Sequence, residues 1–163
     1  KEALARQFGA TDFLNGRDPD IIEQVRALEP YNETMAAGPF NSGGVEWVFD
    51  CVAIPKTTAA AMEMLDWGGT CVVVGVPATG TNLEGIPYTR LTHVERTLVG
   101  CRYGSIVPQR DIPLIVDLYR RGEIMLDELV SVIHPLEDFD HVVEQLHTGA
   151  LARGVFDIAG ASA

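Results

Sequence analysis

The feature that most constrains this chain is the alternation of apolar, strand-like runs with helical segments. Val45–Val52 and Thr70–Val76 are rich in β-branched and aromatic residues, and in the first the apolar side chains point both ways. Between them, Pro55–Trp67 has an apolar stripe at helical spacing and ends at Gly68-Gly69. Strands covered on two faces that alternate with helices are typical of a parallel sheet. We therefore predict an α/β fold with a doubly wound parallel sheet.

The same periodicities predict further elements along the chain. The predicted helices cover residues 1–9, 19–28 behind an Asp18 N-cap, 111–121 and 136–147, and the predicted strands cover 11–15, 96–103 and 154–158. Residues 30–44 and 77–93 are predicted to be irregular, and 126–133 extended. No capping residue or initiator Met precedes the first helix, so we expect the chain to be a piece of a longer polypeptide.

The charge and the cysteines exclude several classes of protein. The formal net charge is −11, and the only lysines are Lys1 and Lys56. Nucleic acid and anionic membranes need a basic patch, so we expect neither partner. No run approaches the roughly 18 apolar residues of a membrane span. The odd number of cysteines, Cys51, Cys71 and Cys101, all in apolar runs, indicates reduced core thiols in a cytoplasmic protein.

Several common catalytic and binding motifs are absent. The glycine fingerprint of dinucleotide-binding domains is missing. Gly75–Thr81 is similar to a phosphate-binding loop, but Thr81 stands where that loop needs lysine. Neither Ser42 nor Ser105 lies in a Gly-x-Ser-x-Gly elbow. No histidine pair or cysteine pair has a zinc-ligand spacing, so we expect no metal site within this chain.

The remaining candidates lie at the carboxyl ends of the apolar strands, where open parallel sheets bind ligands. The segments at these ends are Cys51-Val52-Ala53, Val74-Gly75-Val76 and Gly100-Cys101-Arg102-Tyr103. Small residues there would let a flat ring or a ribose approach the backbone. A glycine in such a place can equally do no more than end a strand.

A series of short motifs follows in order along the chain. The motifs are Lys1-x-x-x-Ala5-x-x-x-Gly9-Ala10-Thr11, Asn15, Gly43-Gly44-Val45-Glu46 before Phe49-Asp50, Gly69-x-x-Val72-x-Val74-Gly75-Val76-Pro77, Arg96-Thr97-Leu98-Val99-Gly100, Asp127-Glu128-Leu129-Val130, Pro135-Leu136-Glu137 and Gly149-x-x-x-Arg153. Their order resembles the zinc-type, medium-chain alcohol dehydrogenases from Lys1 to about Ile158. The resemblance is nearest to the class that contains formaldehyde-oxidising, thiol-dependent enzymes.

This resemblance implies an incomplete Rossmann-type sheet that binds NAD, with NADP not excluded. Residues 1–102 would belong to the dinucleotide-binding domain, and residues 103–163 would return to the catalytic domain. Lys1 is similar to the lysine that binds the adenosine ribose. Arg153 is similar to an arginine that binds the pyrophosphate, a role that suits a forked guanidinium.

The resemblance also implies which residues meet the other parts of the cofactor. Cys51 and Val52 would lie beside the two riboses. Val74, Gly75 and Val76 would line the nicotinamide end. The last group follows at the crossing between the domains, where backbone groups meet the carboxamide: Cys101, Arg102 and Tyr103.

The family's zinc ligands, proton relay, glycine fingerprint and the acidic residue that selects NAD all precede the position of Lys1. The resemblance therefore implies that zinc polarises the alcohol oxygen outside this segment, and that the chain holds no catalytic residue of its own. Hydride passes to the nicotinamide. The implied partners are a small alcohol or aldehyde, and further copies of the chain in a homodimer or homotetramer joined through Thr81–Ile86.

Two other functions remain open from the residues. A zinc-free quinone or enone reductase of the same superfamily would lack zinc ligands upstream of Lys1. A non-catalytic binding or oligomerisation module would have a native start codon directly before Lys1. The uncapped first helix and the missing first strand favour the dehydrogenase.

Overall fold

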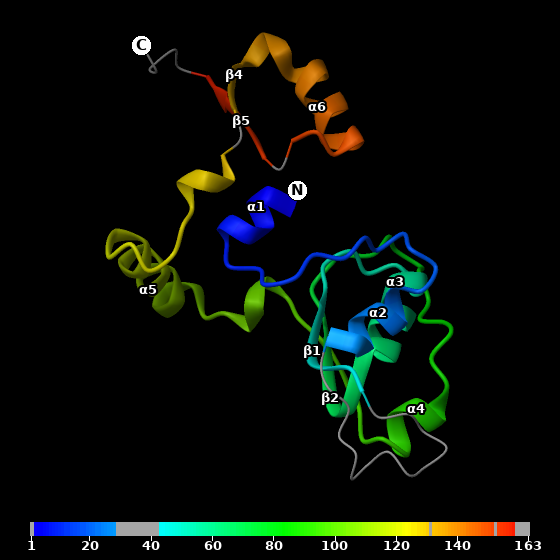
Figure 1. Cartoon of the computed structure of the whole chain (residues 1–163). Helices are drawn as coiled ribbons and strands as arrows, with labels where there is room; N and C mark the ends of the chain where they lie inside the picture. The colour runs from blue at the N-terminus through cyan, green and yellow to red at the C-terminus, as the bar shows by residue number, and fades with distance from the viewer. Residues whose placement is uncertain (1, 29–42, 131, 152, 159–163) are drawn as a thin grey trace. The chain divides into compact units, whose positions relative to one another are not determined.

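The computed structural model describes residues 2–28, 43–130, 132–151 and 153–158. The chain forms two compact units, one made of Leu14–Ile106 and the other of Lys1–Phe13 with Val107–Ala163 (Figure 1). Each unit has a small parallel sheet.

The sheet of the unit Leu14–Ile106 has three parallel strands in the order β1-β2-β3. The strands are β1 (Val45–Asp50), β2 (Leu65–Val73) and β3 (Thr97–Gly100), and helix α3 (Pro55–Met64) connects β1 to β2. A helix between two parallel neighbours is the unit from which such sheets are built. The predicted parallel α/β arrangement is confirmed.

One face of this sheet carries the core of the unit. Met62, Leu65 and Cys71 are fully buried there. Inward-facing side chains of all three strands pack against them, among them Val48 and Leu98. Helix α2 (Ile21–Leu28) packs on α3 on this side of the sheet (Figure 1).

The opposite face of the sheet is exposed, which corrects the expectation of a strand covered on two sides. The side chains of Trp47 and Phe49 are 58% and 61% exposed, and their rings stack with centroids 6.5 Å apart. Phe49 pairs in register with Val72, and Val72 with Val99, so an apolar row crosses the sheet. The pattern predicted apolar character correctly, but the core of the described unit covers only the other face.

The boundary between α3 and β2 also differs from the prediction. The helix ends at Met64, and β2 begins at once with Leu65. Gly68 and Gly69 therefore lie inside the strand, at the place where the pairing with β1 shifts register. Gly68 has a φ of +68°, which glycine adopts without steric cost.

Three other predictions in this part of the chain need correction. Residues 11–15 form no strand, because no described strand pairs with them, and Asn15 is held instead in a local turn by Asp18. Helix α2 begins at Ile21 rather than at residue 19. A short helix, α4 (Tyr88–Thr92), lies in the stretch predicted to be irregular. The loop predicted over 30–44 lies mostly outside the described residues.

The second unit contains the last part of the chain and the first helix. Its elements are α1 (Glu2–Gln7), α5 (Pro108–Arg120), η2 (Asp127–Leu129), β4 (Val132–Pro135), η3 (Leu136–Asp138), α6 (Phe139–Thr148) and β5 (Gly154–Asp157). Strands β4 and β5 are parallel neighbours. Val142 of α6 is buried, and the rings of Phe139 and Phe156 lie 5.7 Å apart. The predicted first helix, last helix and last strand are confirmed, whereas the extended stretch begins only at Val132.

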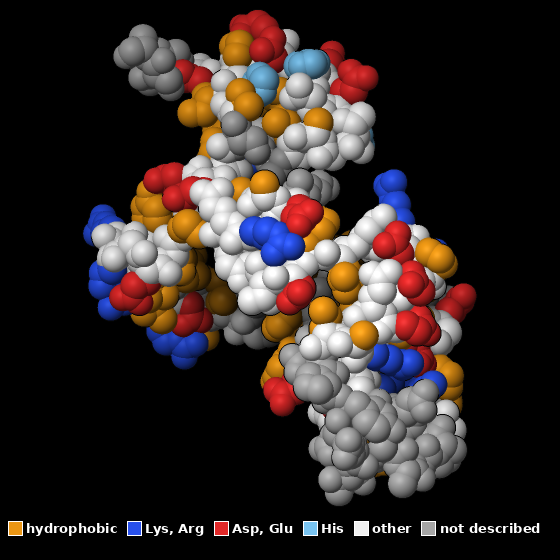
Figure 2. All heavy atoms as spheres, in the orientation of Figure 1, with side chains coloured by type: hydrophobic (Ala, Val, Ile, Leu, Met, Phe, Trp, Pro, Cys, Tyr) orange, Lys and Arg blue, Asp and Glu red, His pale blue; other side chains and the backbone are white. Residues whose placement is uncertain are grey.

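Helix α5 begins at Pro108, three residues before the predicted start, because proline fits the first position of a helix. Its apolar residues stay at the surface, where Figure 2 shows them among charged side chains. The exposed apolar residues of α5 are Ile112, Leu114, Ile115, Val116 and Tyr119. Among the helices of the described chain, α5 included, none has the length and apolar character to cross a membrane.

Candidate functional site

A cavity of about 720 Å³ lies where β2 and β3 end. We call it the strand-end cavity, and its lining is Val74, Gly75, Val76, Pro77, Cys101, Arg102 and Tyr103. Apart from Pro77, every one of these residues is a candidate site residue in the sequence. The structure therefore brings together two predicted segments that are separated by more than twenty residues in the chain.

The side chains of this cavity are open to ligands. Val76 is 92% exposed and Tyr103 is 84% exposed. Arg102 is exposed as well, and among the described residues of the lining it is the one with a charged side chain. The N–H of Cys101 donates to the carbonyl oxygen of Val73 at 3.0 Å, which joins the ends of the two strands. The result is an apolar surface with one cation beside it.

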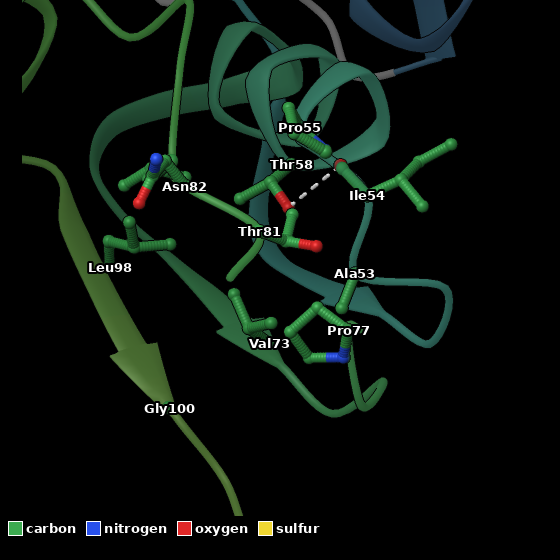
Figure 3. Close-up of a pocket in the computed structure, with 11 residues that line it drawn as sticks. Ala53, Ile54, Pro55, Thr58, Val73, Pro77, Thr81, Asn82, Leu98 and Gly100 are labelled. Atoms are coloured by element: carbon green, nitrogen blue, oxygen red, sulfur yellow. Dashed lines mark hydrogen bonds between the residues drawn. The ribbon is translucent and has the colours of Figure 1, made fainter. Parts of the chain in front are cut away.

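A second cavity, of about 360 Å³, lies beside the N-terminus of α3 and is called here the helix-side cavity. Figure 3 shows side chains from α3, from the strand ends and from the loop after Pro77 around it. The Thr58 hydroxyl, which lines it, donates to the carbonyl oxygen of Ile54 at 3.2 Å. Of the strand-end segments singled out in the sequence, only Ala53 and Gly100 line this cavity, whereas six of the predicted cofactor-binding residues line the strand-end cavity. The strand-end cavity is therefore the candidate functional site.

Cys51 and Val52 follow β1 directly and lie outside the lining of the strand-end cavity. Cys51 is exposed, so the expectation that it is a core thiol was wrong. Strand β1 ends at Asp50, so Cys51 lies just beyond it. Cys71 is the buried thiol, and its pKa is raised by burial and by the charge of Asp50.

The backbone of Val52 nevertheless packs against Gly75, which lines the cavity. A Cβ built on Gly75 would lie 2.6 Å from the carbonyl carbon of Val52 and 2.8 Å from the nitrogen of Ala53. Real Cβ atoms do not approach backbone so closely, so only glycine fits at this position. The turn after β1 and the segment after β2 are thus in direct contact through Gly75.

Asp50, the last residue of β1, holds this turn in place. One carboxylate oxygen, Oδ1, accepts the N–H groups of Val52 and Ala53, each at 3.0 Å. The other, Oδ2, accepts the Thr58 hydroxyl at 2.7 Å, and the Thr57 hydroxyl lies 3.1 Å from both oxygens. Asp50 as a whole is 6% exposed. Its burial raises the pKa, but the four donors outweigh that effect and hold the pKa below its ordinary value.

The main chain of Asp50 adds a second link. Its carbonyl oxygen accepts the N–H of Val74 at 2.9 Å and that of Gly75 at 3.0 Å. Asp50 has no role among the predictions from the sequence. The one signal available was an acidic residue at the end of an apolar strand, which the pattern of hydrophobicity alone does not explain.

Backbone strain marks the end of the cavity lining. Tyr103, Gly104 and Ser105 have φ angles of +50°, +68° and +55°, so three consecutive residues are left-handed. Two of them carry a side chain, which makes this conformation costly. The N–H of Ser105 donates to the carbonyl oxygen of Arg102 at 2.8 Å and closes the turn.

Two predicted residues remain. Lys1 lies outside the described residues. Arg153 is exposed and directly precedes β5 in the other unit. Its pyrophosphate role remains a prediction.

Within the described ranges, no group of three or more His, Cys, Asp or Glu side chains could hold a metal ion. The donor set of this part of the chain therefore does not fit zinc.

Comparison with known proteins identifies the family to which this chain is similar. Residues 1–121 match the family described as "Zinc-binding dehydrogenase". Over 97% of its length the chain is 28% identical to a probable S-(hydroxymethyl)glutathione dehydrogenase of Schizosaccharomyces pombe. Over 93% of its length it is 30% identical to a class-3 alcohol dehydrogenase of Zea mays.

A solved structure supports the same family. The alcohol dehydrogenase zinc-binding domain protein of Burkholderia ambifaria matches 96% of the chain with a TM-score of 0.79 and 27% identity. This likeness confirms the predicted Rossmann-type α/β class. The chain spans 39%, 37% and 38% of the lengths of these three proteins, so it corresponds to a minor part of each.

Proposed function

Because the chain belongs to the zinc-binding dehydrogenase family, we propose that it supplies the cofactor-binding part of an oxidoreductase. That enzyme transfers a hydride between an alcohol, or an aldehyde hydrate or thiol adduct, and a nicotinamide cofactor. The observation that carries the proposal is the strand-end cavity, whose lining comes from residues at the carboxyl ends of two parallel strands. That is where open α/β sheets bind their ligands.

The residues of the cavity fit the nicotinamide end of such a cofactor. Its volume of about 720 Å³ lies within the roughly 300–1,000 Å³ of small-molecule sites. Apolar Val74 and Val76 offer a surface for a flat ring, and Gly75 leaves the backbone accessible. Arg102 would lie at the crossing between the domains, where backbone groups meet the carboxamide. When bound, the nicotinamide ring accepts or releases the hydride.

Other residues complete the proposed cofactor site. Lys1 and Cys51 would meet the adenosine side, Val52 the nicotinamide ribose, and Arg153 the pyrophosphate. Cys101 and Tyr103 would lie by the carboxamide. We assign cofactor binding to residues 1–102 and the return to a catalytic domain to residues 103–163. NAD is the proposed cofactor, and NADP remains an alternative.

The rest of the proposal concerns the whole enzyme. Zinc would be bound by residues outside the described part of this chain, since the described donors do not fit it. The substrate class follows the names of the relatives, one of which acts on a hydroxymethyl thiol adduct. The three free thiols favour a reducing compartment such as the cytoplasm. We also propose a homodimer or homotetramer.

A fluorescence titration with NADH tests the proposed cofactor site in the protein translated from its complete reading frame. Two tyrosines form a matched pair, because Tyr103 lines the cavity, Tyr88 lies at the start of α4, and both are 84% exposed. Tyr103→Ala is expected to weaken NADH binding by about tenfold, the effect of roughly 1.4 kcal/mol. Tyr88→Ala should bind like the wild type.

The two arms of this titration answer different questions. A wild-type protein that binds neither NADH nor NADPH would contradict the proposed function. Equal affinities in both variants, beside a wild type that binds, would contradict the location of the site.

A further inference from the structure

The carboxylate of Asp50 supports the strand-end cavity from outside its lining. It accepts donors from Val52 and Ala53 in the turn after β1, and from Thr57 and Thr58 in the first turn of α3. The turn it holds includes Ala53, whose φ of +57° is unfavourable for a residue with a side chain. Such a conformation persists only where its surroundings enforce it.

Gly75 packs directly against the Val52–Ala53 turn. There is no room for a single extra carbon between Gly75 and the Val52–Ala53 peptide. A shift of that peptide would therefore move Gly75, and with it Val74 and Val76. The Asp50 carboxylate thus contacts the Val52–Ala53 turn, and this turn contacts Gly75 in the cavity lining.

We propose that Asp50 is a positioning residue for the nicotinamide cofactor: through the Val52–Ala53 turn it fixes Gly75, and so the Val74–Val76 wall of the strand-end cavity. The inference rests on the proposed function, because it assumes that this cavity binds the cofactor. Asp50 lines neither cavity.

Asparagine supports the turn less well than the carboxylate. An ionised carboxylate is acceptor-only, whereas the asparagine amide has one acceptor oxygen and a donating NH₂ group. If the amide oxygen keeps the N–H groups of Val52 and Ala53, the NH₂ group faces the Thr58 hydroxyl, which at present donates at 2.7 Å. The turn then loses part of its support while the volume of the side chain stays the same.

Asp66 offers a matched control. It lies near the start of β2, at the opposite end of that strand from the cavity, and its half-buried carboxylate accepts the N–H of Gly43 at 3.0 Å. Asp66→Asn thus removes the same charge far from the wall, and its amide oxygen can keep the hydrogen bond from Gly43. Thr58→Val, an isosteric change, removes one donor to Asp50 and serves as a milder second variant.

The experiment measures the Kd for NADH by fluorescence and the melting temperature of each variant, in the protein from its complete reading frame. Asp50→Asn is expected to raise the Kd by about tenfold, the size of one lost hydrogen bond to a charged group. Thr58→Val should raise it by a smaller factor. Asp66→Asn should leave the Kd unchanged.

The outcomes separate this inference from the proposed function. If the wild type does not bind NADH, the proposed function fails. If the wild type binds and Asp50→Asn binds equally well, Asp50 positions nothing. If Asp66→Asn raises the Kd as much as Asp50→Asn at equal loss of stability, the effect is general destabilisation and the inference is overturned. If Asp50→Asn does not fold, Thr58→Val decides by the same criteria.

Discussion

The guanidinium of Arg96 donates a hydrogen bond of 2.8 Å to the main-chain oxygen of Met62, in the last turn of α3. It also donates to the main-chain oxygens of Leu65 and Asp66. Arg96 is 5% exposed, and burial lowers its pKa. One buried cation therefore satisfies a carbonyl group that the end of α3 leaves without an intrahelical partner, and two more at the start of β2.

Replacing Arg96 by methionine should destabilise the unit Leu14–Ile106. The change leaves buried carbonyl groups without donors, at a cost of about 1–3 kcal/mol in the free energy of unfolding. Chemical denaturation measures this loss. Arg121→Met is the control, since Arg121 pairs with Asp117 and Glu123 at 51% exposure; it should change stability by about 0.5 kcal/mol or less. Equal losses would mean that the buried contacts contribute no more than surface ones.

Gly75→Ala should lower both stability and affinity for a nicotinamide cofactor. The new Cβ would meet backbone atoms of Val52, and relieving such overpacking costs about 1–3 kcal/mol. Gly100→Ala is the control, because nothing lies within 4 Å of a Cβ at that position. A thermal melt and an NADH titration on both variants give the comparison. A Gly75→Ala protein as stable as Gly100→Ala would show that the Val52 peptide moves freely.

Arg153→Ala is expected to weaken binding of NAD more than it slows turnover. A pyrophosphate contact is made equally in the ground state and the transition state, so its loss raises KM and leaves kcat nearly intact. The expected rise is about ten- to a hundredfold, for a hydrogen bond to a charged group of roughly 1.5–3 kcal/mol. Steady-state kinetics with varied NAD measure both constants. Arg120→Ala, also exposed, is the control. A collapsed kcat with an unchanged KM would assign Arg153 another role.

Leu83→Pro should shift the assembled protein towards smaller species. Leu83 is 57% exposed and lies in residues 81–87, which form no strand with another described part of the chain. An edge with unpaired backbone groups can pair with a second copy, and proline removes one N–H from each copy. Light scattering on a sizing column measures the mass.

Ile86→Ala is the companion variant to Leu83→Pro. Ile86 packs against the core cluster of Met62 and Leu65, so its truncation should lower the melting temperature without changing subunit number. A folded Leu83→Pro protein of unchanged mass would count against this interface.

The contribution of Asp50 to stability should depend on pH in a defined direction. Its pKa is lowered in the folded state, so its stabilising effect is complete above the ordinary aspartate pKa of about 3.9. The effect is lost as pH falls through the lower, folded-state pKa. The difference in unfolding free energy between wild type and Asp50→Asn should therefore be constant from pH 7 to 5 and shrink below about pH 4. A difference that grows on acidification would contradict the hydrogen-bond assignment.

The sequence predicted the elements whose pattern is local. The apolar runs at β1, β2, β3 and β5 could be found because a strand with a buried face needs such residues. Residues 11–15 show the limit of this argument, because a strand exists only where a neighbour pairs with it. The early start of β2 at Leu65 was missed for a related reason: Gly68 and Gly69 are typical of a helix end, and only the pairing with β1 identifies a bulge.

The candidate site could be predicted in part. The glycine and the small apolar residues after β2 and β3 indicated the strand-end cavity, since topology places those ends together. Asp50 could not be found in this way, because its role depends on hydroxyl groups that only the fold brings to it. The exposure of Cys51 was also missed, since hydrophobicity does not state at which residue a strand ends.

The apolar row of Trp47, Phe49, Val72 and Val99, in which all but Val72 are exposed, bears on how copies of this chain behave in concentrated solution. A net charge of −11 keeps copies apart by repulsion. That repulsion reaches roughly 8 Å at physiological ionic strength but only about 3 Å in 1 M salt. Attraction between apolar faces is not screened in this way, and salts such as sulfate strengthen it. Colloidal stability therefore falls as salt is added, and dilute, low-salt buffers keep this chain dispersed.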